Sequence, residues 1–356
     1  MTTTGTFRNV GDDPSAARAA VVERRVMPPE SARPTIIDVA RAAGVSKSQV
    51  SAALRGDSGV SGESRDRVLA AAERLGYRKN GWAQRLVSGR SQLIGVLLTD
   101  LRNAYHTDIV NGIEDAAAEA GLGVLLRHGR RDRALLHRHL DELVDLGVDG
   151  VIAVTSHLPP EDLAAASARA PMVVVGRPVG VPDGVGQVRN DDAAGARLAT
   201  AHLQSLGHRR IAMLRGSDRP AASARRDAWR EEMAAAGVVA QEFDARDRGV
   251  ERLLAAVGAG EGPTAVFASN DRIAAGLLGE ALDRGLAAPE DLAVVGYDNT
   301  ELAGLLRPGL TSVDQPRGAM GRAAMAQLGE LLAGRGVQTE VAAPSLVVRA
   351  STVAGR

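Results

Sequence analysis

The chain has 356 residues, of which 45% are hydrophobic, so it is long enough for two or three domains with sizeable cores. It has no cysteine, which excludes disulfides, thiolate nucleophiles and cysteine-based zinc sites. The sequence shows neither an export signal nor an apolar run of about 18 residues, and this predicts a cytoplasmic protein without a membrane segment.

The formal net charge is zero, but the charges are unevenly distributed. Residues 34–90 hold ten Lys or Arg against five Asp or Glu, so a small basic segment precedes a mildly acidic remainder. This distribution favours a nucleic-acid-binding part only weakly, because an ordinary solvated surface gives the same excess. Residues 1–33 are rich in Thr, Ala, Pro and charge without periodicity, and are predicted to be a disordered leader in which Met27 is an alternative start.

Residues 34–78 predict three short helices. Thr35 and Asp38 form a capping pair for the first helix, which ends at Gly44. Ser46 and Gln49 have the same relation at the start of the second helix, so the chain must turn sharply between the two.

The third predicted helix follows Ser61 and ends at Gly76, with Val68, Ala72 and Leu75 on its inner face. Two helices separated by a tight turn are typical of a helix-turn-helix, whose second helix enters the major groove of DNA. A helical hairpin used only for packing is the alternative.

In a helix-turn-helix, the first residues of the second helix meet the base edges. Lys and Arg pair with guanine and Gln with adenine, while the Ser46 cap points backbone N–H groups toward a phosphate. The expected DNA contacts are Thr35, Ser46, Lys47, Ser48, Gln49, Ser51, Ala52, Arg55 and Asn80, with Leu86 added below.

The segment TIIDVARAAGVSKSQVSAALRGDSGVSGESRDRVLAAAERLGY, residues 35–77, resembles the headpiece of the lactose-repressor (LacI/GalR) family of bacterial transcriptional regulators. The following KNGWAQRLVSGR, residues 79–90, resembles the hinge helix of that family, which inserts a leucine into the minor groove. Leu86 matches that leucine, although a simple linker contact is the alternative. The family often has Arg where this chain has Ala52, which leaves operator preference open.

After residue 90 the pattern changes to apolar strands that alternate with helices rich in Ala and Leu. Continuous apolar strands of this kind predict parallel sheets covered on both faces, in an α/β fold. The expected strands are 93–99, 124–126, 151–155, 172–176, 211–214, 265–268, 292–297 and 346–349.

The family resemblance extends to about Arg349, through segments such as TAVFASNDRIAAGLLGEAL and PEDLAVVGYDNTELAGLLRPGLTSVDQP. It implies a two-lobed sensor similar to periplasmic sugar-binding proteins. The first lobe would comprise residues 91–188 and 316–344, and the second residues 189–315 and 345–356. Crossings between the lobes are expected near residues 188, 315 and 345. The resemblance also implies a homodimer on double-stranded operator DNA, and the absence of terminal leucine heptads favours a dimer over a tetramer.

Polar residues that directly follow apolar strands are candidates to face a ligand cleft. From the residues alone these are Asp100, Asn270, Asp271 and Asp298, although strand-end Asn and Asp often cap the next helix instead. The resemblance implies a small-molecule effector, with a carbohydrate favoured, bound by Asp100, Tyr105, Arg177, Arg225, Asn270, Asp298 and Gln315. His106 stands where the family usually has a second aromatic ring, which reduces the surface for stacking a sugar.

An enzyme and a plain ligand-binding protein are the competing interpretations. The sequence has no G-x-x-x-x-G-K-[ST], no H-E-x-x-H and no G-x-S-x-G, and no G-x-G-x-x-G follows a predicted strand. We therefore expect no enzymatic activity, no cofactor and no metal. The basic headpiece argues against a plain binding protein and favours a ligand-responsive, sequence-specific transcriptional regulator, which we expect to be a repressor.

Overall fold

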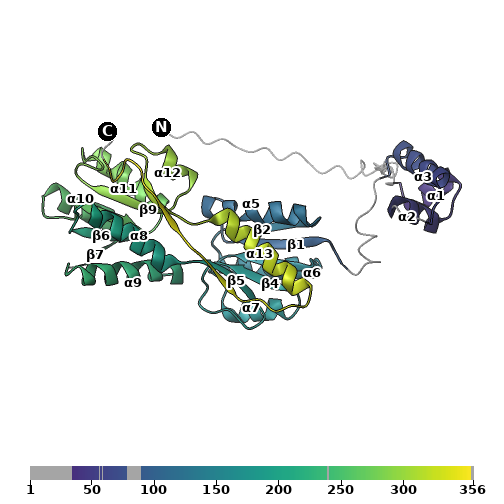
Figure 1. The fold of residues 1–356 in the computed structure, drawn as a ribbon, viewed down its shortest axis with the longest axis horizontal. Helices are drawn as coiled ribbons and strands as arrows, with labels where there is room; N and C mark the ends of the chain where they lie inside the picture. Colours follow the sequence, from purple (N-terminus) through teal and green to yellow (C-terminus); the bar gives the residue numbers. More distant parts are fainter. Residues whose placement is uncertain (1–33, 56, 58, 78–89, 239, 354–356) are drawn as a thin grey trace, which may run out of the picture. The chain divides into compact units, whose positions relative to one another are not determined.

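The computed structural model describes residues 34–55, 57, 59–77, 90–238 and 240–353. They fall into two compact units, one on each side of the peptide bond between Gly81 and Trp82 (Figure 1). The leader expected over residues 1–33 and nearly all of the hinge expected over residues 79–90 lie outside the described residues.

The first unit is a three-helix bundle of α1 (Ile36–Ala43), α2 (Lys47–Arg55) and α3 (Gly62–Arg74). Thr35 closes a capping box with Asp38, and Gly44 ends α1 in the left-handed conformation at φ 67°. A second capping box starts α2: the Ser46 amide donates to Gln49 Oε1 over 3.0 Å, and the Gln49 amide donates to Ser46 Oγ over 3.2 Å. The predicted caps of these two helices are therefore present.

The core of the bundle is formed by Val39, Val50 and Val68, which have no exposed surface. The prediction that Leu75 lies inside is wrong, because its side chain is 38% exposed. Leu75 is the C-cap residue of α3, and Ala71, one turn earlier, is buried instead.

The second unit contains two six-stranded sheets. The first sheet has the order β11–β5–β4–β3–β1–β2, and all of its strands are parallel. The strands are β1 (Leu93–Leu98), β2 (Gly123–His128), β3 (Gly150–Val154), β4 (Met172–Val175), β5 (Gly186–Asn190) and β11 (Thr339–Ala342). Helices α5 (Ala104–Glu119) and α13 (Arg317–Leu332) cover one face, and α6 (Arg133–Asp145) and α7 (Pro160–Ser167) cover the other. We call this sheet and its helices the first lobe.

The second sheet has the order β12–β10–β9–β8–β6–β7. Its strands are β6 (Ile211–Arg215), β7 (Gln241–Asp244), β8 (Ala265–Ala268), β9 (Ala293–Asp298), β10 (Thr311–Asp314) and β12 (Ser345–Val347). Helices α8 (Asp192–Ser205) and α9 (Pro220–Ala235) pack on one face, and α10 (Gly249–Gly258), α11 (Asp271–Asp283) and α12 (Glu301–Leu305) pack on the other. This is the second lobe.

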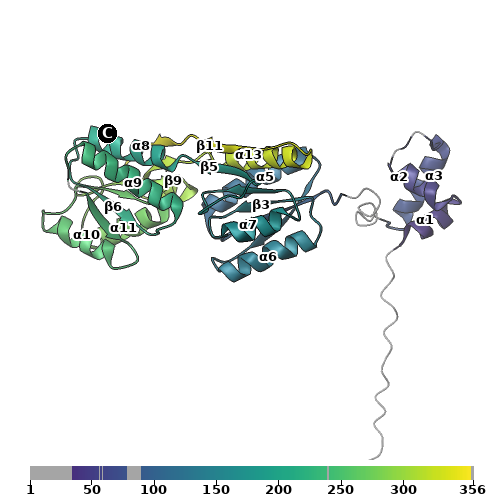
Figure 2. The same cartoon turned by 90° about the horizontal axis from the view of Figure 1, so that it is seen from below.

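The chain passes between the lobes three times: after β5, after β10, and between β11 and β12 (Figures 1 and 2). Because β10 leads out of the second lobe while β12 leads back into it, β12 pairs antiparallel with β10. Every other pair is parallel, as predicted. Since β5 runs toward the second lobe and β10 toward the first, the carboxyl ends of both sheets face one another across the space between the lobes.

Helices α5 and α13 approach closely at glycines. A Cβ built on Gly112 would lie 2.2 Å from the carbonyl oxygen of Gly318, and one built on Gly321 would lie 2.2 Å from the carbonyl oxygen of Ile109. No side chain larger than hydrogen fits at either position without moving a backbone, so these glycines set the distance between the two helices.

Candidate functional site

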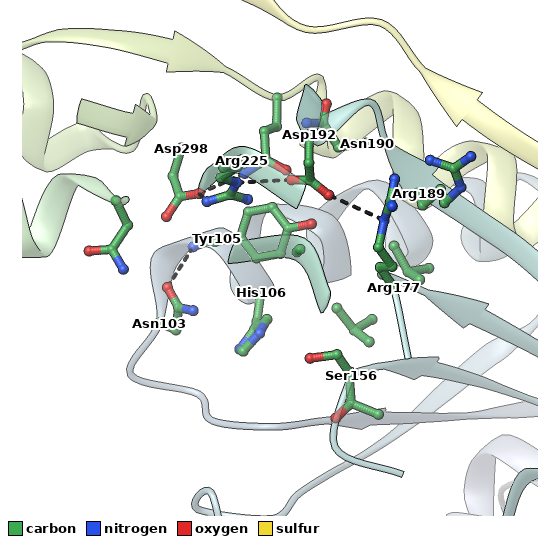
Figure 3. Close-up of a pocket in the computed structure, with 17 residues that line it drawn as sticks. Asn103, Tyr105, His106, Ser156, Arg177, Arg189, Asn190, Asp192, Arg225 and Asp298 are labelled. Carbon is green, nitrogen blue, oxygen red and sulfur yellow. Dashed lines mark hydrogen bonds and ion pairs between the residues drawn. The ribbon is translucent and has the colours of Figure 1, made fainter. Parts of the chain in front are cut away.

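A cavity of about 180 Å³ lies between the two lobes (Figure 3). The first lobe contributes residues from 103–106, 154–156, 175–177 and 189–190. The second lobe contributes residues from α8, α9 and β9 and the N-cap of α11, and Gln315 follows β10. This volume is below the range of about 300–1,000 Å³ typical of sites for drug-sized ligands, so the cavity suits a small metabolite. Six of the seven predicted effector positions line it: Tyr105, Arg177, Arg225, Asn270, Asp298 and Gln315.

Arg225, from α9, is fixed by several groups at once. Its Nε donates to Asp192 Oδ1 over 2.9 Å and its Nη1 donates to the Ser269 carbonyl oxygen over 2.8 Å. The guanidinium also lies over the Tyr297 ring, 3.6 Å from the ring centroid. An arginine held this firmly needs little further ordering to bind a ligand.

Asp298 ends β9 with φ 104°, a backbone conformation that residues with a side chain rarely adopt. Its Oδ1 accepts a hydrogen bond from Gln315 Nε2 over 2.6 Å and lies 3.9 Å from Arg225 Nη1. Burial raises the pKa of Asp298 to about 7, and the nearby Arg225 opposes this shift only in part. The carboxyl can therefore exchange a proton near neutral pH and present a donor or an acceptor to the cavity.

Asn270 combines the two roles considered for it. Its Oδ1 caps α11 by accepting from the Ile273 amide over 2.9 Å, while the residue also lines the cavity. Asp271 has a structural role instead, because it accepts hydrogen bonds from the Thr300 amide over 2.8 Å and from Ser312 Oγ over 2.5 Å. It does not line the cavity.

Asp100 is the predicted effector position that the structure does not bring into the cavity. Its carboxylate pairs with Arg102 over 3.1 Å and with Arg131 over 3.0 Å, and the residue is only 1% exposed. The hydrogen bonds from Arg102 hold the pKa of Asp100 at about 2. Its oxygens are thus occupied by neighbouring arginines.

Tyr105 and His106 stand in the first turn of α5, with their ring centroids 5.6 Å apart and their planes at 64°. This edge-to-face arrangement gives no flat surface formed by two parallel rings. His106 Nδ1 lies 3.1 Å from the Asp100 carbonyl oxygen, and burial, which disfavours the charged imidazolium, lowers the pKa of His106.

Several lining residues were missed by sequence reasoning. The most informative are Arg189 and Asn190 on β5 and Asp192 at the start of α8. Asn190 Nδ2 donates to the Tyr297 hydroxyl over 2.7 Å and so connects the first lobe to the second. The run VRNDD before an Ala-rich helix has the same strand-end character as Asp298, but β5 was not predicted as a strand.

In the first unit, the predicted DNA-contacting face is the start of α2. Lys47, Ser48 and Gln49 are exposed, whereas Ser51 and Ala52 are half-buried. Gln49 Oε1 is bonded to Ser46, so pairing with adenine through both amide atoms would require Gln49 to leave the capping box.

The other predicted DNA contacts either take part in helix caps or lie outside the described residues. The hydroxyl of Thr35 donates to Asp38 Oδ2 over 2.7 Å. Arg55 is the last residue of α2, and its side chain lies outside the described part, as do Asn80 and Leu86.

Within the described residues, no helix is long and apolar enough to cross a membrane. The same part of the chain contains no group of three or more His, Cys, Asp or Glu that could hold a metal ion.

Comparison with known proteins matches each of the two units to a protein family. Residues 35–80 match the profile of bacterial regulatory proteins of the lacI family, and residues 200–352 match that of a periplasmic binding protein-like domain. Catabolite control protein A of Priestia megaterium is 31% identical over 302 residues, which cover 82% of this chain and 90% of that protein. The chain belongs to the LacI family.

Solved LacI-family structures have the same architecture. A lac repressor dimer bound to operator and an anti-inducer aligns with a TM-score of 0.80 at 29% identity, covering 90% of this chain and 99% of that one. A complex of the transcriptional regulator CelR with cellobiose aligns with a TM-score of 0.64 at 32% identity, covering 90% and 100%. As a LacI-family member, this protein is a ligand-responsive, DNA-binding transcriptional regulator.

Proposed function

We propose that the protein is a cytoplasmic repressor without enzymatic activity that binds operator DNA as a homodimer. Its DNA affinity would be controlled by a small carbohydrate-like metabolite in the cavity between the lobes. The observation that carries the proposal is the shared lining of this cavity, with Tyr105 and Arg177 from the first lobe opposite Arg225 and Asp298 from the second. The cellobiose complex of CelR supports a carbohydrate as the effector class.

A ligand that touches both lobes favours the arrangement of lobes in which all its contacts are made. It can alter DNA affinity only through a difference in its own affinity for the two arrangements. Asn190 and Tyr297 form a buried hydrogen bond across the same boundary, so the resting protein already favours one arrangement.

On the DNA side, we propose that Lys47, Ser48, Gln49, Ser51, Ala52 and Arg55 face the major groove. Thr35, Ser46 and Asn80 would contact the backbone. The symmetry of the dimer then requires a pseudo-palindromic operator, with Leu86 of each chain at its centre. Leu86→Ala should weaken binding to a verified operator. Equally tight binding would refute the insertion of Leu86 into the minor groove.

The test of the effector site is a thermal-shift screen of the whole chain against sugars, polyols, nucleosides and sugar acids. A ligand at about 100 times its Kd adds about 2.7 kcal/mol to the free energy of unfolding. The operator is first isolated as the genomic fragment that the protein retards in a gel, and each hit is then titrated into the protein–operator complex.

Arg225→Ala and Asp298→Ala should each abolish the shift and the response on DNA, whereas the exposed Arg209→Ala serves as the matched control. A shift that survives in both cavity variants, or a ligand that binds without changing operator affinity, would contradict the proposal.

A further inference from the structure

The cavity has more positive than negative side chains. Among its lining residues, the arginines are Arg177, Arg189 and Arg225, and the carboxylates are Asp192 and Asp298. Asp192 is committed to Arg225 through the 2.9 Å hydrogen bond, and Asp298 is partly protonated near neutral pH, because burial raises its pKa to about 7. The remaining positive charge lies on the side of the first lobe.

Neither Arg189 nor Arg177 makes a hydrogen bond within the described residues. The guanidinium of Arg189 makes no hydrogen bond or ion pair within the described residues, although the side chain is half-buried in the cavity wall. Arg177 Nε is buried without a hydrogen-bond partner within the described residues, and its ion pair with Asp192 Oδ2 is long, at 3.7 Å. A buried charged donor without a hydrogen bond costs more than a neutral one, so this arrangement indicates an acceptor that the ligand supplies.

The two arginines occupy neighbouring positions. The Gly176 amide donates to the Val188 carbonyl over 2.8 Å, which places Arg177 and Arg189 at the adjacent ends of β4 and β5. Figure 3 shows both on one side of the cavity, with Arg225 and Asp298 on the other. Guanidinium groups in this position suit a carboxylate or phosphate, which accepts two parallel hydrogen bonds.

The rest of the lining suits hydroxyl groups. Asn190 Oδ1 and Gln315 Oε1 are buried acceptors to which no described residue donates a hydrogen bond, and Asn103, Thr155, Ser156 and Asn270 add further amides and hydroxyls. Each unpaired oxygen can accept a hydrogen bond from a ligand hydroxyl.

Building on the proposed function, we infer that the effector is a polyhydroxylated anion, whose carboxylate or phosphate group is held by Arg177 and Arg189. Its hydroxyl groups would be held by the amides and by Arg225 and Asp298. The anionic group distinguishes this ligand from a neutral sugar.

The test is titration calorimetry of the whole chain with matched trios of compounds: glucose, glucuronate and glucose 6-phosphate, and the corresponding galactose and mannose series. Within at least one trio, an anion should bind at least about tenfold more tightly than its neutral parent, since hydrogen bonds to charged groups are the stronger ones. Tighter binding of the sugar acid would identify the anionic group as a carboxylate, and tighter binding of the sugar phosphate would identify it as a phosphate. Added salt should weaken the binding of the anion and leave the affinity for the neutral sugar unchanged.

Arg177→Gln and Arg189→Gln should each lower the affinity for the anion by about tenfold or more, whereas Arg209→Gln, on the surface, should leave it unchanged. The inference is overturned if no anion exceeds its neutral parent in any trio, or if Arg189→Gln behaves like Arg209→Gln. A neutral sugar that alone binds and changes operator affinity would overturn the anion and leave the proposed function intact. Conversely, an anion that binds through both arginines without changing operator affinity would support the anion and contradict the proposed function.

Discussion

Gly112→Ala is expected to destabilise the first lobe. The new Cβ would lie 2.2 Å from the Gly318 carbonyl oxygen and 2.9 Å from its Cα, atoms of the α13 backbone that cannot rotate away. Overpacking of this kind costs about 1–3 kcal/mol, against a gain of about 1 kcal/mol from replacing glycine by alanine within a helix. Because the clash is with backbone, we expect the upper part of that range and a net loss of about 1–2 kcal/mol.

The assay is urea unfolding at a single protein concentration, because the stability of a dimer depends on concentration. The matched control is Gly329→Ala in α13, where a Cβ meets nothing within 4 Å. It should raise stability by about 0.5–1 kcal/mol, since alanine loses less backbone entropy on folding. A Gly112→Ala protein as stable as the parent would show that the two helices can separate at no cost, and the reasoning would fail.

Three further predictions concern the cavity and the DNA-binding face. The folded pKa of Asp298 is about 7 against 3.8 for an exposed carboxyl, so the folded state holds the extra proton between these values and stability should fall as pH rises through that window. Asp298→Asn should remove this slope, up to about 1.4 kcal/mol per pH unit, in urea unfolding at several pH values; an unchanged slope would assign it to another group. Lys47→Ala should weaken operator binding by about 1–3 kcal/mol in anisotropy titrations and relax specificity at the base pair that it faces, without changing stability. Tyr297→Phe should lower the free energy of unfolding by about 1–3 kcal/mol, since Asn190 Nδ2 loses its acceptor, and unaltered thermal unfolding would argue against that bond.

The parts of the fold that were predicted from the sequence depend on local signals. The capping boxes at Thr35 and Ser46 involve residues three positions apart, and strands such as β8 are uninterrupted apolar runs. β5, β7, β10 and β11 were missed because each is only four or five residues long and carries charged or polar side chains. Their strand character comes from pairing with distant neighbours, which a local pattern does not contain.

The residues that line the cavity likewise include some that local sequence signals identified and others that they missed. Asp298 was identifiable because it ends an apolar strand, but Arg189 lies on β5 and Asp192 follows it, and this strand was not recognised. Asp100 satisfies the same strand-end rule, yet Arg102 and Arg131 take its oxygens. A rule based on sequence position places a residue at the edge of a sheet, but only the neighbours in space decide which way the side chain turns.

Lys47 stands exposed at the first turn of α2, and Lys79 is the only other lysine in the chain. Apart from the terminal amine, reagents that modify primary amines will therefore label only positions in or beside the DNA-binding unit. The arginine-rich cavity will not react with them. If Lys47 faces the operator as proposed, its protection from acetylation would report operator occupancy by mass spectrometry. Since the chain has no cysteine, a single cysteine introduced into either lobe would add an independent label for lobe movement.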